Sequence, residues 1–174
     1  DALIALLGRE LVEKYTALNR PLLTTREAFA LKSPANDDYL KAYRQGDAGQ
    51  RRGVLKRLQS LPLPDVGSFT GPQALDVEWF FTPSELVNLM AAVQDLPVFS
   101  INPGVASPDN WQHIAFKGGS EPGVINLTTW LVGRSGTNYC VVATWNNDEV
   151  LDEVQFVGLY SGILRQLAEM DAKQ

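Results

Sequence analysis

Four consecutive residues, Lys117-Gly118-Gly119-Ser120, carry the clearest chemical pattern in the sequence. They end a run of aromatic and β-branched residues that begins at Trp111, so we expect them at the end of a strand. Two glycines let a ligand approach the backbone closely, and the lysine supplies a positive charge beside exposed N–H groups. This combination suits a substrate carboxylate and a developing oxyanion. The structural alternative for the glycine pair is a simple turn between two strands.

Two further titratable residues are candidates for the same site. His113 lies four residues before Lys117, so strand alternation puts both side chains on one face. A lone histidine in a strand also has a simpler interpretation, which is packing. Glu27 is a candidate general base, but it also completes the pattern Thr24-x-x-Glu27 of a helix-capping box, and we favour that structural role.

The composition excludes several other chemistries. One histidine and one cysteine, Cys140, leave no basis for a His- or Cys-rich metal site, an internal disulfide framework or a Ser-His-Asp triad of the usual kind. We therefore expect no metal and no cofactor. Cys140 lies in an apolar run, where we expect a buried and unreactive thiol.

The charge and the apolar runs exclude two classes of partner. A net charge of −5 removes the usual electrostatic basis for binding nucleic acid. No apolar run approaches the roughly 18 residues of a membrane-spanning helix. The remaining candidate partners are a small molecule and other protein chains.

Helical patterns dominate the first part of the chain. Residues 1–18 place leucines and Tyr15 on one stripe, which predicts a single amphipathic helix with the buried residues Leu3, Leu6, Leu7, Leu11, Tyr15 and Leu18. Shorter helices are expected at about 24–31, 37–45 and 48–60, and another begins at Thr82-Pro83. The breaker-rich stretch 61–75 predicts a loop, and 77–81 predicts a short extended piece.

Strand patterns dominate the last part of the chain. Three runs predict strands at 111–117, 124–132 and 138–145, and their short connections favour an antiparallel meander. A final helix is expected over about 149–170, with Gly158 and Gly162 allowing it to lie close to the sheet. We therefore expect an α+β fold within one domain, with a mainly helical region at 1–110 and the sheet plus the C-terminal helix at 111–174.

The run from Trp111 to Gly123, followed by two strands and a helix, resembles the superfamily of serine β-lactamases and penicillin-binding proteins. In that superfamily a Lys-Thr/Ser-Gly motif lies on the corresponding strand. Leu6-Leu7-Gly8-Arg9, the segment 24–31 and the helix at Thr82-Pro83 resemble the tract upstream of that strand. The likeness covers essentially the whole chain, although only the lysine-glycine segment reaches the level of a motif. It implies a β-lactamase/transpeptidase-like fold in which the C-terminal helix packs on the sheet.

The resemblance also implies roles for the motif. Lys117 would bind the substrate carboxylate and tune protons around the nucleophile, and Gly119 would give clearance. The backbone N–H of Ser120 would be one donor of the oxyanion hole, with its hydroxyl touching the carboxylate. Lys117 and Ser120 are thus the expected catalytic residues, and Gly118, Gly119 and His113 join them as substrate-binding residues.

Three departures from the family pattern qualify this expectation. Gly118 stands where the family has threonine or serine, so one hydrogen bond to substrate is missing or replaced. No Ser-x-x-Lys nucleophile motif and no Ser-Asp-Asn motif occur in suitable positions. The spacing around Glu27 also differs from the family's Arg-x-x-Glu-x-x-Leu-Asn loop, which predicts slow hydrolysis of a β-lactam.

Both missing motifs would lie before Asp1, so we expect these residues to be the C-terminal part of a longer serine hydrolase that is inactive by itself. Its substrate would be a β-lactam, peptide or ester. The alternative is a non-catalytic relative that binds peptidoglycan fragments or a protein partner. Three strands alone would leave an open edge, so we expect either a homodimer or pairing with the missing N-terminal segment. A periplasmic or secreted location is implied by the resemblance only.

Overall fold

The computed structural model describes residues 2–65, 67, 69 and 71–174. The chain divides into two compact units, unit 1 (Asp1–Thr82) and unit 2 (Pro83–Gln174). The fold is mixed α+β, with a three-stranded antiparallel sheet and a C-terminal helix, as the sequence predicts. The boundary between the units falls before the helix at residue 83, whereas the sequence extended the helical region to residue 110.

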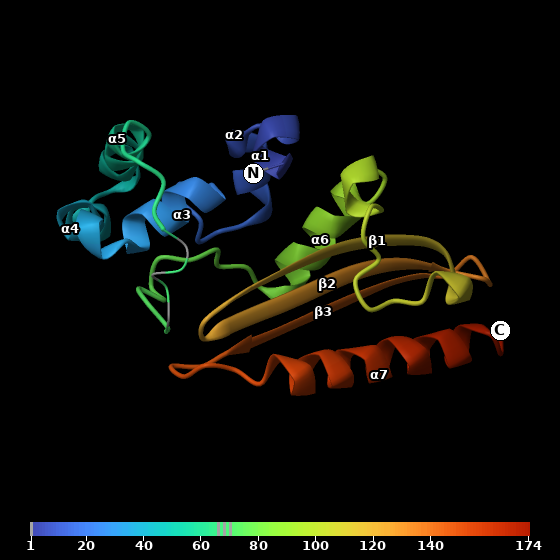
Figure 1. Ribbon diagram of the computed structural model, residues 1–174. Coiled ribbons are helices and arrows are strands. Elements are labelled where there is room, and N and C mark those ends of the chain that lie inside the picture. The colour runs from blue at the N-terminus through green and yellow to red at the C-terminus, as the bar shows by residue number, and fades with distance from the viewer. Residues whose placement is uncertain (1, 66, 68, 70) are drawn as a thin grey trace. The chain divides into compact units, whose positions relative to one another are not determined.

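Unit 1 is built from short helices around a small core. Capping boxes open two of the helices, Thr24 with Glu27 and Asp47 with Gln50, which confirms the predicted starts of both. Leu31 and Leu58 are almost completely buried in the core that these helices share. The bounds, labelled in Figure 1, are α1 (Ala2–Leu7), α2 (Arg9–Val12), α3 (Thr25–Lys32), α4 (Asp37–Gln45) and α5 (Ala48–Leu58), with 3₁₀ turns at Glu13–Tyr15 and Pro34–Asn36.

The prediction of one amphipathic helix over residues 1–18 is wrong. Gly8 adopts a positive φ of 79°, a conformation that glycine reaches without steric penalty, and it separates α1 from α2. The change of direction also changes which face is buried, because Leu6 is 58% exposed and Leu18 is 66% exposed. Val12 is buried instead. The predicted Leu3 side chain lies outside the described residues.

Unit 2 contains the sheet and two helices that pack on it. The strands pair in the order β1-β2-β3, and α6 and α7 lie on opposite faces of the sheet (Figure 1). Residues 77–81, predicted to be extended, belong to no strand that the structure describes. The bounds in unit 2 are α6 (Pro83–Val93), β1 (Trp111–Glu121), β2 (Val124–Gly133), β3 (Asn138–Asn146) and α7 (Glu153–Asp171), with 3₁₀ turns at Pro97–Phe99 and Pro108–Asn110.

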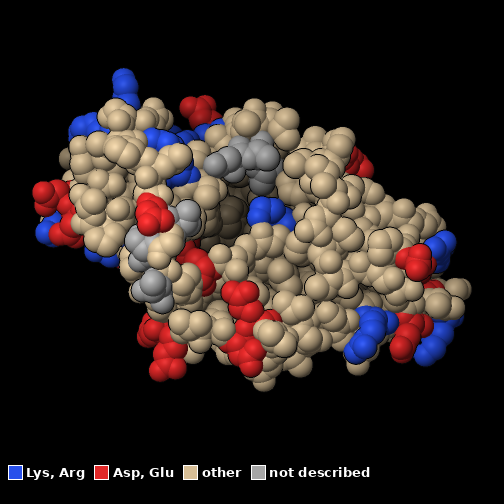
Figure 2. Space-filling view, in the orientation of Figure 1, with Lys and Arg blue, Asp and Glu red and all other residues tan. Residues whose placement is uncertain are grey.

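The core of unit 2 lies between the sheet and α7. Leu131 from β2 and Tyr160 from α7 are almost completely buried there. The Tyr160 hydroxyl lies 2.8 Å from the Thr129 hydroxyl and donates to the Val141 carbonyl at 2.9 Å, so the polar atoms in this core are paired. Towards its end α7 carries exposed charges of both signs, and Figure 2 shows blue and red side chains mixed where the helix finishes.

The two glycines of α7 do not have the role that the sequence predicted for them. Gly158 is exposed, and a Cβ placed on it would meet nothing within 4 Å. A Cβ on Gly162 would meet only the end of the Arg165 side chain, at 4.0 Å. The glycines therefore point away from the sheet, and the close approach of α7 does not depend on them.

We expect Gly158→Ala and Gly162→Ala each to raise the free energy of unfolding by about 0.5–1 kcal/mol, because alanine has the higher helix propensity and each site has room. Urea denaturation of the single and double variants measures this. The matched control is Gly133→Ala in β2, where the new Cβ would overlap the Asp171 carboxylate and stability should fall. A loss of stability in the α7 variants would show that the glycines contact something after all.

Candidate functional site

Lys117 and Gly119 lie on the face of the sheet opposite α7. Phe116 packs into the core with α7, and strand alternation turns its neighbour Lys117 to the other side. β1 continues as a strand to Glu121, and the chain turns through Pro122 and Gly123. The glycine pair is therefore part of the strand and not the turn itself, which removes the simple-turn interpretation of Gly118-Gly119.

A row of polar side chains crosses the sheet beside Lys117. The register pairs Lys117 with Thr128 and Gly119 with Asn126. The Asn126 amide donates to the Thr144 hydroxyl at 2.6 Å, and the Thr128 hydroxyl donates to the Asn126 side-chain oxygen at 3.2 Å. The row fixes the side chains next to the lysine and gives this end of the sheet a polar surface.

The Lys117 side chain is exposed, and its amine donates to the Gly118 carbonyl. No carboxylate among the described residues forms an ion pair with it. Partial desolvation by the surrounding protein lowers the pKa of the Lys117 ammonium, because loss of water disfavours the charged form. The site thus offers a cation that is free to bind a carboxylate from outside.

The two glycines of the motif have different surroundings. A Cβ on Gly118 would lie 2.7 Å from the Phe116 ring and 3.0 Å from a Leu127 methyl, closer than packed atoms tolerate. A Cβ on Gly119 would meet nothing within 4 Å. Packing therefore requires glycine at 118, whereas 119 faces open space on the side of Lys117. This is a physical reason for Gly118 at the position where the resemblance expects threonine or serine.

We expect Gly118→Ala to lower the free energy of unfolding by about 1–3 kcal/mol, because the added methyl group overpacks the core beside Phe116. Gly119→Ala, one residue further along the same strand, should leave stability within about 0.5 kcal/mol of the parent. Urea denaturation of both variants tests the contrast. Equal effects from the two substitutions would contradict the assignment of their faces.

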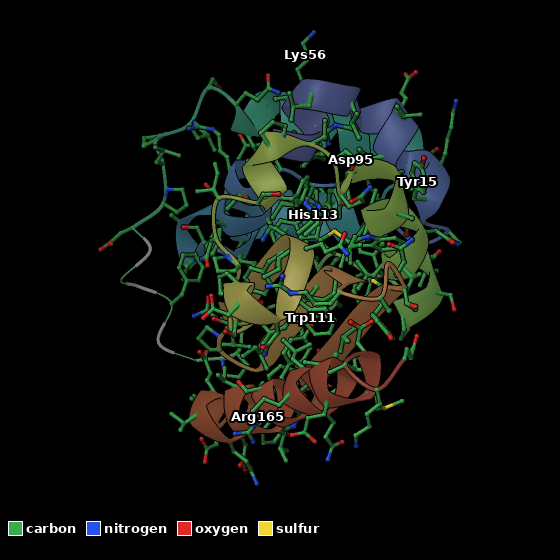
Figure 3. All side chains as sticks on the ribbon, turned by 90° about the vertical axis from the view of Figure 1, so that its right-hand side faces the viewer. Tyr15, Lys56, Asp95, Trp111, His113 and Arg165 are labelled. Carbon is green, nitrogen blue, oxygen red and sulfur yellow. The ribbon has the colours of Figure 1, made fainter. Side chains whose placement is uncertain are left out.

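His113 lies on the same side of the sheet as Lys117 but not beside it. Figure 3 shows His113 on the side of the sheet where Asp95 lies and Trp111 nearer to α7. The His113 Nε2 lies 3.1 Å from the Gln94 carbonyl oxygen, and since a carbonyl only accepts, Nε2 carries the proton. Ala115 separates His113 from Lys117 on this face, and a rise of about 3.3 Å per residue puts the two residues roughly 13 Å apart along the strand. His113 is held by the end of α6 and does not reach the lysine.

Glu27 lies in unit 1 and is fully engaged there. Both of its carboxylate oxygens lie 2.9 Å from Nη2 of Arg9, and one accepts from the Thr24 backbone N–H at 2.8 Å. Glu27 is only 4% exposed. The capping-box interpretation is confirmed, and the role of general base stays a prediction.

Among the residues described by the structure, the remaining titratable groups point to no second centre of chemistry. Burial raises the pKa of the Cys140 thiol to about 11, so little of it is the reactive thiolate at neutral pH. The residues that the structure describes contain no cluster of three or more His, Cys, Asp or Glu side chains suited to a metal ion. Within the same residues, no helix has the length and apolar character needed to cross a bilayer.

Sequence reasoning missed Asn126 and Thr128 as neighbours of the lysine. The signal was present, because Pro122-Gly123 is a two-residue turn with Gly123 at a positive φ of 87°, and such a turn fixes the register of a hairpin. Counting back from the pair Glu121–Val124 gives the pair Lys117–Thr128. Treating all of 118–123 as the connection hid this register.

A comparison of the chain with models of known protein families finds no match, and a comparison with curated proteins finds none either.

Proposed function

We propose that this chain is the carboxylate-binding part of a serine hydrolase that resembles β-lactamases and penicillin-binding proteins. The reaction would be acyl transfer from a β-lactam, peptide or ester, with the serine nucleophile supplied from outside residues 1–174. The observation that carries the proposal is the exposed Lys117 ammonium beside the open backbone of Gly119.

The lysine supports a carboxylate-bearing substrate. It has no ion-pair partner among the described residues, and a charge-assisted hydrogen bond to a carboxylate is about twice as strong as a neutral one. The Ser120 side chain is not a second donor beside the lysine: Ser120 pairs with Ile125, a residue of the core with α7, so strand alternation puts its hydroxyl on the face opposite Lys117. A substrate held at its carboxylate end would place its carbonyl further along the strand.

The position of β1 supports an oxyanion site. In the described sheet β1 is an edge strand, so alternate backbone N–H groups point away from β2 and can donate to a ligand. In the proposed reaction the serine oxygen bonds to the carbonyl carbon, the hydroxyl proton passes to a base, and the carbonyl oxygen becomes negative. The Ser120 N–H would stabilise that charge before it collapses and expels the leaving group, and loss of one such donor typically costs about 10²–10³ in rate.

Covalent labelling with a fluorescent penicillin tests the proposal. We expect the complete product of the gene to be labelled, and the chain of residues 1–174 to remain unlabelled under the same conditions. Lys117→Ala in the complete product should slow acylation by about 10–100-fold. Lys56→Ala, which removes an exposed lysine from α5, is the matched control and should have no effect.

Two outcomes would overturn the proposal. Labelling of residues 1–174 alone would show that the nucleophile is within this sequence. Failure to label the complete product would favour the non-catalytic alternative, a relative that binds peptidoglycan fragments or a protein. In that case the role of Lys117 would be tested by measuring whether Lys117→Ala weakens the binding of a muropeptide, instead of by measuring acylation.

A further inference from the structure

A pocket within unit 1 has no part in the proposed reaction. Its volume is about 250 Å³, which suits a fragment-sized molecule rather than a large one. Its walls combine apolar side chains with charged ones at the ends of two helices and the segment before residue 82. The lining residues are Leu18, Asn19, Arg20, Pro21, Leu23, Tyr43, Arg44, Arg51, Asp76, Val77, Glu78 and Phe80.

The acidic side chains of the pocket are already neutralised by partners in the protein. Asp76 binds Arg44 through two hydrogen bonds of 2.5 and 2.7 Å, and this pairing lowers the pKa of Asp76 below its usual value. Glu78 forms an ion pair with Lys32, which is buried. Neither carboxylate is available to balance a further positive charge.

Two arginines of the pocket have no acidic partner among the described residues. Arg51 lies over the Tyr43 ring, with its guanidinium carbon 5.1 Å from the ring centre, and its Nε donates to the Tyr43 carbonyl at 3.1 Å. This holds the guanidinium in place, and neither of its Nη groups has a hydrogen bond to the residues that the structure describes. Arg20 uses only one nitrogen, which donates to the Asn19 carbonyl at 2.9 Å. The pocket therefore presents two cations with unused donors.

The rest of the wall suits an apolar body with one further polar contact. Leu18 and Phe80 line the pocket and are 66% and 37% exposed, so their surface can contact a hydrophobic ligand, whereas Pro21, Leu23 and Val77 are buried behind the wall. Tyr43 is only 7% exposed, and its hydroxyl has no hydrogen-bond partner among the described residues. No buried side-chain oxygen among the described residues lacks a hydrogen-bond partner, so this hydroxyl reaches solvent, where it can donate to a ligand.

We propose that this pocket binds a small organic anion: a carboxylate held by Arg51 and Arg20, carried on an apolar body that contacts Leu18 and Phe80. An arginine fork matches a carboxylate in geometry as well as charge. Because Arg51 is pre-positioned over Tyr43, little side-chain entropy is lost on binding. This inference does not rest on the proposed acyl transfer.

Benzoate and benzamide form a matched pair of probes, since they share the apolar ring and differ in charge. We titrate each into the chain of residues 1–174 at constant ionic strength and follow the backbone amides by two-dimensional NMR. Saturable shifts of Leu18, Tyr43 and Val77 are expected with benzoate. Benzamide should bind at least about tenfold more weakly, as loss of a hydrogen bond to a charged group implies.

Arg51→Gln should weaken benzoate binding by about tenfold, and Arg20→Gln, which changes an exposed side chain and so keeps the fold, by about threefold or more. Arg57→Gln is the matched control, because Arg57 is an exposed arginine of α5 outside the pocket. Equal affinity for the two probes, shifts at other residues, shifts that do not saturate, or unchanged binding by both pocket variants would overturn the proposal.

Discussion

Replacing Glu27 with alanine is expected to lower the free energy of unfolding by about 3–5 kcal/mol, because it removes one partner of a largely buried ion pair and leaves the other uncompensated. The lost contacts are those to Arg9 and to the Thr24 backbone N–H. The second contact is half of the capping box of α3, which adds to the loss. Urea denaturation followed by circular dichroism measures the effect, since unit 1 is largely helical.

Glu10→Ala is the matched control for Glu27, because Glu10 is an exposed acid on α2. It should change stability by no more than about 0.5 kcal/mol. A double-mutant cycle with Arg9→Ala isolates the pair itself, and a coupling energy near zero would contradict the importance of this contact.

Glu27→Gln separates the structural role from the catalytic one. The glutamine oxygen can still accept from the Thr24 N–H, so Glu27→Gln should be more stable than Glu27→Ala although it also lacks the negative charge. If Glu27 acts as a general base in the complete protein, this variant should accumulate acyl-enzyme even where it remains folded. If Glu27 serves only in capping and ion pairing, the deacylation rate should fall only in proportion to the fraction of the protein that is folded.

Local rules predicted the elements that depend on neighbouring residues. The pattern Thr24-x-x-Glu27 places a side-chain acceptor and its reciprocal partner three residues apart, so this helix start was visible without any tertiary information. The α4 bounds of 37–45 agree with the prediction. Alternation in the predicted strand at 111–117 also placed His113 and Lys117 on one face, which is the part of the candidate site that the sequence could supply.

Features that depend on one backbone conformation or on distant contacts were not predictable in this way. Gly8 is compatible with a continuous helix until its positive φ is known. A register irregularity between Trp111 and His113 turns the Trp111 side chain towards the core with α7, because an extra residue in a strand shifts its alternation. The pocket of unit 1 is lined by side chains from separate segments between Leu18 and Phe80, and no local sequence pattern predicts that these segments lie together.

The pair Lys32–Glu78 is a contact of that distant kind and has the second large expected effect. The lysine and glutamate side chains are 2% and 9% exposed, so both charges of the pair are largely removed from water. Glu78→Ala should lower the free energy of unfolding by about 3–5 kcal/mol, because it removes the carboxylate that pairs with a buried ammonium. The double variant Lys32→Met/Glu78→Leu, which removes both charges, should be near the parent in stability or above it.

The exposed pair Arg44–Asp76 provides the matched comparison two residues away in the sequence. Its side chains are 42% and 56% exposed, so water already solvates both charges and Asp76→Ala should cost less than about 1 kcal/mol. Urea denaturation at neutral pH compares the two alanine variants directly. If Asp76→Ala and Glu78→Ala have the same effect, burial does not set the strength of these pairs, and the Lys32 ammonium must be compensated by other groups.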